Sequence, residues 1–359
     1  MKIVVAGGGT GGHVFPALTV AQEFRNAGHE VLMVGTAHGL EATLAPKRGF
    51  ELALIDIHGF TGQSLSYRFG FCLLLVRSVW QSLRLLRRFR PDVVLGVGGY
   101  VSAPVLVAAR VLGIPYVLHE QNAIPGAVNR LMGRWARCVC LSFPDESGIF
   151  GRSVLTGNPV RGDIFACPEI PGEPPALLVF GGSQGARALN QAMVAALPLL
   201  ETWRGRLRIR HQTGAADLET VRAGYRNAGW DEGNVVPFID DMAGAYAEAQ
   251  LVLCRAGATT LAELAGCGRP AVLVPFPFAA HDHQMKNARA LEKRGAALVL
   301  PQEELTPEHL AALIGELLDD QARLRKMGAA IRALARPDAA QNIVRECLRC
   351  TEKKRAAAQ

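Results

Sequence analysis

The sequence predicts an α/β protein built from two doubly wound parallel sheets in tandem, on three observations. Short apolar runs alternate with segments of helical period along most of the 359 residues. A strand, a glycine turn and a helix open the chain at 2–27, and the same order recurs at 176–200. Between these copies, 166–175 contains four prolines. We interpret that segment as an interdomain linker.

The predicted elements of the first half alternate regularly. Its strands are expected at 2–6, 30–35, 51–57, 92–96, 115–118, 137–141 and 153–155. Its helices are expected at 14–27, 39–47, 67–89, 103–111 and 125–134. Such alternation produces a parallel sheet wrapped by helices.

The second half repeats this pattern. Its strands are expected at 176–180, 206–211, 234–236, 251–254, 271–274 and 297–300, with helices between them and a helical tail from about 306. Ligands of open parallel sheets bind at the carboxyl ends of the strands. We therefore expect two domains facing across a cleft that both sets of loops line.

Composition indicates a globular protein, with 49% hydrophobic and 20% charged residues. No apolar run has the length of a membrane span and no signal-peptide pattern precedes the first strand, so we expect a cytoplasmic protein. Cys347 and Cys350 form a lone C-x-x-C, which we interpret as ordinary helix residues rather than a metal or redox site. No disulfides are expected in a reducing compartment.

A basic segment accounts for much of the net charge of +7, since 57–91 contains no acidic residue. Its arginines interleave with apolar side chains, and tryptophan next to arginine suits a membrane interface. The candidate membrane residues are Arg77, Val79, Trp80, Arg84, Arg87 and Arg88. The alternative is a buried helix with a solvated basic edge. No nucleic-acid partner is expected.

The opening glycine turn is a candidate phosphate site. Gly7, Gly9 and Gly12 satisfy G-x-G-x-x-G between a strand and a helix, whose free amides favour anions. The second strand ends in Gly35-Thr36 without the acidic residue that an NAD site requires. His13 at the helix entrance is available for proton transfer. The alternative is a tight turn that binds nothing.

Three further motifs follow strands of the first half. Gly98 and Gly99 belong to a second glycine loop, with Ser102 as the expected N-cap, and should lie beside His13 with room for a pyrophosphate. Glu120, in His119-Glu-Gln-Asn122, is either a base or a group that orients its neighbours. Arg161 can pair with phosphate or remain a surface arginine.

The second half offers groups for a nucleotide. Ser183 lies in its glycine turn, and a helix expected to start near Ala258 suits a diphosphate. Glu263, about one turn further, can bind a ribose diol. Gln284 and Asn287 suit sugar hydroxyls. His281, Asp282 and His283 are weak grounds for a metal, and we predict none.

Together these motifs resemble the MurG family, the peptidoglycan N-acetylglucosaminyltransferases of bacteria. The matching segments are 8–16, 94–102, 119–122, 157–161, 181–186, 255–258 with Glu263, and 283–284. The resemblance implies a GT-B fold and transfer of N-acetylglucosamine, with inversion, from UDP-N-acetylglucosamine (UDP-GlcNAc) to a lipid-linked muramyl-pentapeptide pyrophosphate (lipid I), which gives lipid II. It also implies an acceptor and membrane domain at 1–160, a donor domain at 161–335, and a last helix at 336–352 that packs back on the first domain.

The resemblance also implies the binding residues. The acceptor pyrophosphate would lie at Gly9, Thr10, Gly11, Gly98, Gly99 and Tyr100. The donor would contact Thr10, Gly11, Gly12, Asn122, Arg161, Ser183, Phe238, Ile239, Ala258, Thr259, Thr260, Leu261, Ala262, Glu263, Gln284 and Asn287. Related sequences vary between Ala258 and Glu263, which leaves the roles of Thr259 and Thr260 open.

For catalysis, His13 is the first candidate base and Glu120 the second. Without a D-x-D carboxylate pair, we expect a helix N-terminus and arginine to stabilise the leaving UDP, with no cofactor. The expected location is the cytoplasmic face of the inner membrane, with anionic lipid and other cell-wall synthesis proteins as partners. The alternatives are another UDP-sugar enzyme of this fold, such as an epimerase, and a non-enzymatic nucleotide-sugar-binding module.

Overall fold

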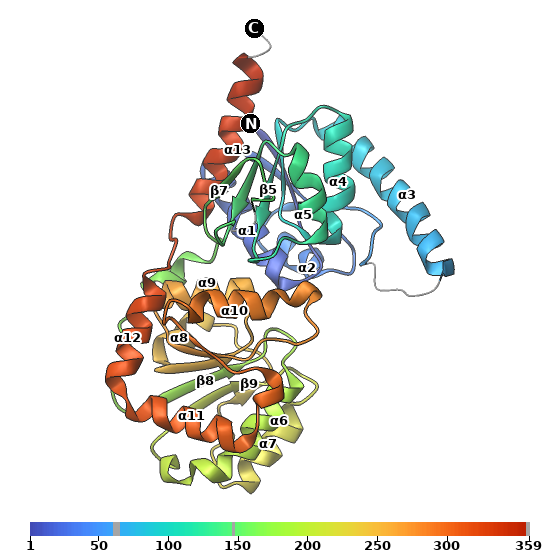
Figure 1. Ribbon diagram of the computed structural model, residues 1–359. Coiled ribbons are helices and arrows are strands. Elements are labelled where there is room, and N and C mark those ends of the chain that lie inside the picture. Colours follow the sequence, from blue (N-terminus) through green and yellow to red (C-terminus); the bar gives the residue numbers. More distant parts are fainter. Residues whose placement is uncertain (60–64, 146–147, 357–359) are drawn as a thin grey trace. The chain divides into compact units, whose positions relative to one another are not determined.

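The computed structural model describes residues 1–59, 65–145 and 148–356 (Figure 1). Its contacts divide the chain into two units. Unit 1 consists of Met1–Val160 together with the chain from Pro337 onward, and unit 2 of Arg161–Arg336. Each unit contains its own parallel sheet.

The sheet of unit 1 has β1 in its interior. Its order is β3 (Glu51–Leu54), β2 (Glu30–Gly35), β1 (Lys2–Ala6), β4 (Val93–Gly96), β5 (Tyr116–Glu120), β6 (Cys138–Leu141) and β7 (Ser153–Leu155). The helices are α1 (Gly11–Asn26), α2 (Leu40–Lys47), α3 (Leu65–Phe89), α4 (Gly99–Val111), α5 (Ala127–Met132) and α13 (Ala339–Ala356), with a 3-10 turn at Gly133–Trp135.

Alternating side chains of β1 enter two different cores, as the pleat of a strand requires. Ile3 and Val5 pack with α1 and α13, whereas Val4 and Ala6 pack with α3 and α4. Both faces are therefore covered, which explains why these strands are apolar throughout. α13, the last helix, belongs to the same unit (Figure 1), where it packs against α1 and against β4, β5 and β6.

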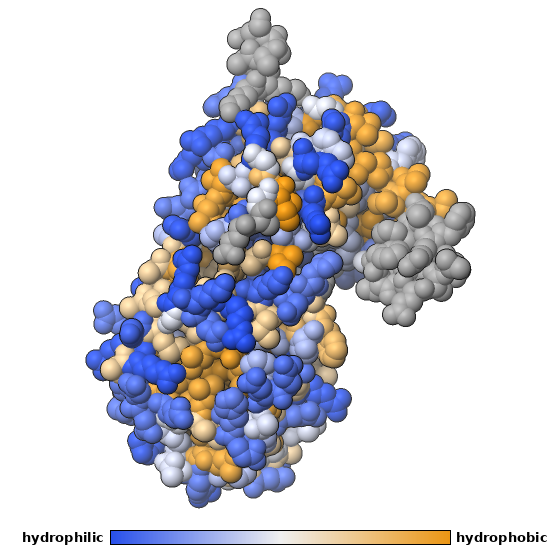
Figure 2. All heavy atoms as spheres, in the orientation of Figure 1, coloured by the Kyte–Doolittle hydropathy of each residue, from blue (hydrophilic) through white to orange (hydrophobic). Residues whose placement is uncertain are grey.

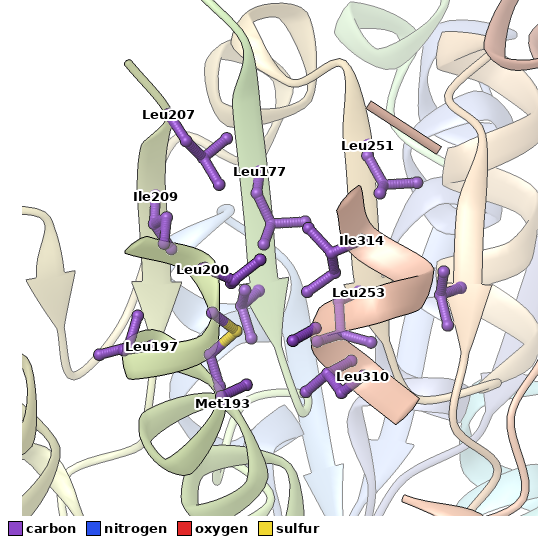
Figure 3. Packing of buried hydrophobic residues seen from close by; sticks show 14 of the residues in the cluster. Leu177, Met193, Leu197, Leu200, Leu207, Ile209, Leu251, Leu253, Leu310 and Ile314 are labelled. Atoms are coloured by element: carbon purple, nitrogen blue, oxygen red, sulfur yellow. The ribbon is translucent and has the colours of Figure 1, made fainter. Parts of the chain in front are cut away.

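Unit 2 repeats the plan. Its sheet order is β10 (Val235–Val236), β9 (Arg208–Gln212), β8 (Ala176–Phe180), β11 (Leu251–Cys254), β12 (Ala271–Leu273) and β13 (Leu298–Val299). Its helices are α6 (Arg187–Ala196), α7 (Leu218–Asn227), α8 (Met242–Glu248), α9 (Ala258–Cys267), α10 (His283–Glu292), α11 (Pro307–Asp319) and α12 (Gln321–Arg332). Further 3-10 turns are Gly162–Ala166, Leu197–Trp203, Ala280–Asp282 and Gln302–Glu304. Figure 3 shows Leu177 and Leu253 of two central strands packed among side chains that include Met193, Leu310 and Ile314.

The interpretation of 166–175 as a linker is wrong, because the segment belongs to unit 2. The guanidinium of the fully buried Arg269 donates to the carbonyls of Pro168 and Glu169 at 3.0 and 3.4 Å. Gln250 Nε2 donates to the carbonyls of Pro171 and Gly172. Proline prevents regular secondary structure but leaves carbonyls as acceptors, so a proline-rich segment can be packed firmly.

The two helices of unit 1 that follow the glycine loops begin three or four residues earlier than predicted. α1 begins at Gly11 and α4 at Gly99, so glycines that we assigned to loops form first turns. Gly98, with φ of 90°, precedes α4, and Ser102 is therefore not its N-cap; its hydroxyl donates to the Gly99 carbonyl at 3.0 Å. The shift places His13 inside the first turn of α1.

Cys347 and Cys350 are free buried thiols on α13, in the same core as Cys138 and Cys140. No group of three His, Cys, Asp or Glu side chains in the described residues is arranged to hold a metal ion. Within that same part of the chain, no helix combines the length and apolarity needed to cross a membrane.

Candidate functional site

The first glycine loop brings helix amides and His13 to the carboxyl end of β1. The first amides that donate within α1 are those of His13 and Val14, both to the Thr10 carbonyl. The amides of Gly11 and Gly12 precede them and point out of the helix end, where the dipole favours an anion. Thr10 Oγ1 lies 3.1 Å from His13 Nδ1, so the hydroxyl orients the imidazole.

The two glycine loops lie side by side, as expected. A Cβ atom at Gly98 would come 3.0 Å from His13 Cδ2 and 3.1 Å from Nε2. A Cβ atom at Gly99 would come 2.9 Å from the Gly8 carbonyl oxygen, and Gly99 has φ of 74°. Only glycine allows the loops to approach this closely. Tyr100 also lies close to Gly9, because a Cβ atom at Gly9 would come 3.1 Å from the Tyr100 hydroxyl. The residues predicted to bind the acceptor pyrophosphate are therefore close together in unit 1.

Gly9 departs from its predicted role because its amide is already bound. The Gly9 N–H donates to Glu41 Oε2 at 3.0 Å. That amide is therefore directed into the protein, which leaves the amides of Gly11 and Gly12 as the candidate anion donors of this loop. We did not identify Glu41 from the sequence, since a glutamate in the first turn of a helix is usually a solvated residue.

The His119–Asn122 motif is more enclosed than we expected. His119, Glu120 and Gln121 are buried, at 0, 2 and 2% exposure. Glu120 Oε1 accepts from the Asn122 amide at 3.0 Å, and Oε2 accepts from the Gly126 amide and Asn129 Nδ2, both at 2.9 Å. Burial raises the pKa of Glu120, and these hydrogen bonds partly oppose the increase. The contacts favour the orienting role of Glu120 over the base.

His119 holds two segments of unit 1 together. Its Nδ1 lies 3.1 Å from Gln121 Nε2 and accepts from it, which leaves the Nε2 proton for the Gly157 carbonyl at 3.2 Å. Burial lowers the pKa of His119 to about 4, so the ring is neutral at physiological pH. The motif therefore fixes the loop after β5.

The predicted nucleotide groups of unit 2 gather at the start of α9. The helix begins at Ala258, as predicted, and its first intrahelical amide is that of Leu261, bonded to Gly257. Tyr246 Oη donates to Glu263 Oε2 at 3.0 Å. Burial raises the pKa of Glu263 to about 7, against smaller lowering effects from Tyr246 and Arg161. Arg161 thus lies near Glu263 in unit 2, although it also contacts Asp163 at 3.6 Å.

Four predicted donor contacts need correction, because the side chains concerned are buried. Ala258, Leu261, Ile239 and Asn287 are 9, 3, 3 and 0% exposed. Asn287 Nδ2 donates to the Ala256 carbonyl at 3.4 Å, and so supports the loop before α9. The Ile239 amide donates to Gln212 Oε1 at 2.9 Å. These residues can serve a ligand only through the backbone or by positioning other groups.

The remaining predicted donor residues are at least partly accessible. Phe238 and Ser183 are exposed, while Thr259, Thr260, Ala262 and Gln284 are half-buried. Gln284 Oε1 accepts from the Phe276 amide at 2.9 Å, so it also orders the loop before α10.

Two polar residues of unit 2 belong to the site framework without having been assigned a role from the sequence: Gln212 was missed, and Arg255 was noted only as part of the matching segment 255–258. Gln212 Nε2 donates to the Gly182 carbonyl at 2.8 Å, so Gln212 connects the loops after β8 and β10. The buried Arg255 donates to the carbonyls of Val274 and Pro275, both at 3.1 Å. Its positive charge lies just before α9, where a diphosphate is expected.

The described part of α3 presents the apolar and basic surface that the sequence suggested. Leu73, Val76 and Trp80 are 60, 68 and 54% exposed, and Figure 2 shows apolar surface in this region. Arg84 stacks over Trp80 at 4.4 Å, while Arg77 pairs with Asp56 at 2.8 Å. Ser78, Ser82 and Leu86 form the buried face. A buried helix with a basic edge does not account for the exposed apolar side chains.

Comparison with known proteins places both units in one family. The models for the glycosyltransferase family 28 N-terminal and C-terminal domains match residues 3–141 and 176–343. A curated relative from Syntrophotalea carbinolica is 58% identical over 97% of this chain and 98% of its own. One from Geobacter sulfurreducens is 48% identical over 98% of this chain and 100% of its own. Both are named UDP-N-acetylglucosamine--N-acetylmuramyl-(pentapeptide) pyrophosphoryl-undecaprenol N-acetylglucosamine transferase.

A solved structure agrees with this relationship. MurG of Acinetobacter baumannii superimposes with a TM-score of 0.79 at 36% identity, covering 97% of this chain and 99% of that protein. A UDP-N-acetylglucosamine 2-epimerase described as putative, from Listeria monocytogenes, reaches 0.70 at 15% identity, covering 96% and 94%, and shares the fold alone.

Proposed function

The chain belongs to glycosyltransferase family 28, and we propose from this premise that it transfers N-acetylglucosamine from UDP-GlcNAc to the lipid-linked N-acetylmuramyl-pentapeptide pyrophosphate. The observation that carries the proposal is the 58% identity, over nearly the whole chain, to a relative with this activity in its name. The GT-B fold and the two sets of candidate residues agree with it.

Unit 1 binds the acceptor in this proposal. Its support is the meeting of two glycine loops at His13, with the outward amides of Gly11 and Gly12 suited to the pyrophosphate. His13 is the general base. With its Nδ1 proton donated to Thr10 Oγ1, the Nε2 atom takes the proton of the muramyl hydroxyl. That oxygen then bonds to the anomeric carbon as the bond to UDP breaks, and the configuration is inverted.

Unit 2 binds the donor. Glu263 accepts hydrogen bonds from the ribose diol, and the first amides of α9 face the diphosphate. Developing negative charge on the leaving UDP is stabilised by this helix end and by Arg255 and Arg161. These groups already supply positive charge, so we propose that no metal ion is required.

In this proposal the protein associates with the membrane through α3. This assignment is supported by the exposed apolar side chains of Leu73, Val76 and Trp80, which share the helix with the exposed Arg84, Arg87 and Arg88. These side chains suit an anionic surface, with the apolar groups entering the interface. We place the protein at the cytoplasmic face of the inner membrane, in cell-wall synthesis, with roles in cell shape and division and contacts with other proteins of that process.

The test is incubation with UDP-GlcNAc and a short-chain lipid I analogue. We expect a disaccharide product and UDP release that requires the acceptor. UDP release without acceptor, accompanied by an epimerised sugar nucleotide, would support the epimerase. Binding of UDP-GlcNAc without turnover would support a binding module.

A further inference from the structure

Glu41 lies buried between the two loops that follow β1 and β2. It occupies the first turn of α2, and its side chain is 0% exposed. Oε2 accepts from the Gly9 amide at 3.0 Å, and Oε1 accepts from both the amide and the hydroxyl of Thr36, each at 2.9 Å. All these partners are donors, which matches an ionised carboxylate, an acceptor-only group. Charge-assisted bonds of this kind are the strong ones.

The neighbouring glycines fit this side chain. A Cβ atom at Gly8 or at Gly39 would lie 2.3 or 2.2 Å from a carboxylate oxygen of Glu41, and one at Gly35 would lie 2.3 Å from its Cγ. Real Cβ atoms do not approach other atoms so closely, so the three positions accept only glycine while Glu41 keeps the conformation that it has here. The glycine at position 8 is thus explained by Glu41 and needs no ligand.

The loop that Glu41 holds is the one that faces the proposed acceptor. The Gly8 carbonyl oxygen packs against Gly99, and Gly9 packs against Tyr100. Thr10, the next residue, bonds the His13 ring. A change in the path of Gly8–Thr10 would therefore move both glycine loops and the imidazole.

We propose that Glu41 is a positioning residue for the acceptor site, a role that rests on the proposed function. Its carboxylate turns the Gly9 amide into the protein and so determines that Gly11 and Gly12 supply the amides for the acceptor pyrophosphate. A negative charge enclosed behind an anion site would repel the ligand if it were unpaired. Here three donors face it, so it orders the loop at little electrostatic cost.

The kinetic test compares Glu41→Gln with Thr36→Val. Glutamine has the same shape, but its amide cannot accept from Thr36 and Gly9 together, so the loop loses one anchor. We expect the acceptor KM to rise about tenfold, while the KM for UDP-GlcNAc stays within twofold. Thr36→Val removes one donor to Oε1 but keeps the Gly9 bond. It should lower the melting temperature and leave the acceptor KM unchanged.

A binding experiment separates this role from turnover. Inorganic pyrophosphate is titrated calorimetrically into the full chain with UDP saturating unit 2, and Glu41→Gln should bind it several-fold more weakly than the unchanged protein. If Glu41→Gln does not fold, Glu41→Asp, which keeps the charge on a shorter side chain, replaces it with the same expected direction.

Several outcomes would overturn the role of Glu41. They are an unchanged acceptor KM and pyrophosphate affinity in the folded variant, equal losses for Glu41→Gln and Thr36→Val, or no pyrophosphate binding to the unchanged protein. Failure of the proposed function appears separately, as absence of acceptor-dependent transfer by the unchanged protein.

Discussion

Glu263 should make UDP affinity depend on pH across neutrality. Burial raises the pKa of this carboxyl to about 7, and the ribose diol offers two O–H donors that an ionised carboxylate accepts. The ionised fraction rises from ~10% at pH 6 to ~90% at pH 8 for such a pKa. If only the ionised form binds the diol, affinity for UDP should increase about tenfold over this range, or about 1.4 kcal/mol.

The assay is calorimetric titration with UDP at pH 6, 7 and 8. Glu263→Gln is the matched control, because it keeps the shape and an acceptor oxygen but cannot titrate. Any pH dependence of UDP affinity that remains in this variant arises from titration of the UDP phosphates. A second control is 2′-deoxy-UDP, which lacks half of the diol and should show a weaker pH dependence with the unchanged protein.

Stability should respond in the opposite direction. The ordinary pKa of the carboxyl is 4.5, so between about pH 4.5 and 7 the folded protein retains a proton that the unfolded chain has lost. The free energy of unfolding should therefore decrease as pH rises through this window, and less so for Glu263→Gln. Equal UDP affinity at pH 6 and 8, or the same pH dependence in both proteins, would refute the assignment of the diol to Glu263.

Three further predictions concern the base and the membrane surface of unit 1, and the proposal that transfer requires no metal ion. His13→Ala should reduce kcat by about 10²–10⁴-fold with UDP binding intact, since general-base catalysis is typically of that size; His13→Asn with near-normal kcat and a flat pH profile would exclude the base. Replacing Arg84, Arg87 and Arg88 by Gln should weaken co-sedimentation with anionic vesicles by roughly 1 kcal/mol per residue. Arg77→Gln should matter less because Asp56 pairs with it, and equal effects would contradict this reading of the surface. Chelation of divalent ions with EDTA should leave the initial rate of transfer unchanged; a loss restored by Mg²⁺ would show that a metal is needed.

Local pattern was sufficient for the strands and for the presence of glycine turns after them, although it placed the starts of α1 and α4 too late. Ile3–Ala6 and Ala176–Phe180 are apolar runs followed by glycine, and both form central strands that end in the predicted turns. The start of α9 at Ala258 follows equally from the small residues beside Gly257. These features depend on neighbours in sequence, which is why they can be predicted without coordinates.

Contacts between distant segments decided the rest. Glu41 meets Gly9 across 32 positions, Gln212 joins loops 30 and 27 positions away, and Arg269 binds carbonyls about a hundred positions earlier. Each is a polar side chain in a sequence context typical of solvated residues, and only folding shows that it is buried and which groups it bonds. The same reason turned 166–175 from an expected linker into a packed segment. Glu120 is a different case, because the groups that enclose its carboxylate come from the segment that directly follows it. The periodicity of a sequence indicates which face of a helix or strand is apolar. The hydrogen-bonding partner of a buried polar side chain depends instead on which distant segments the fold places next to it.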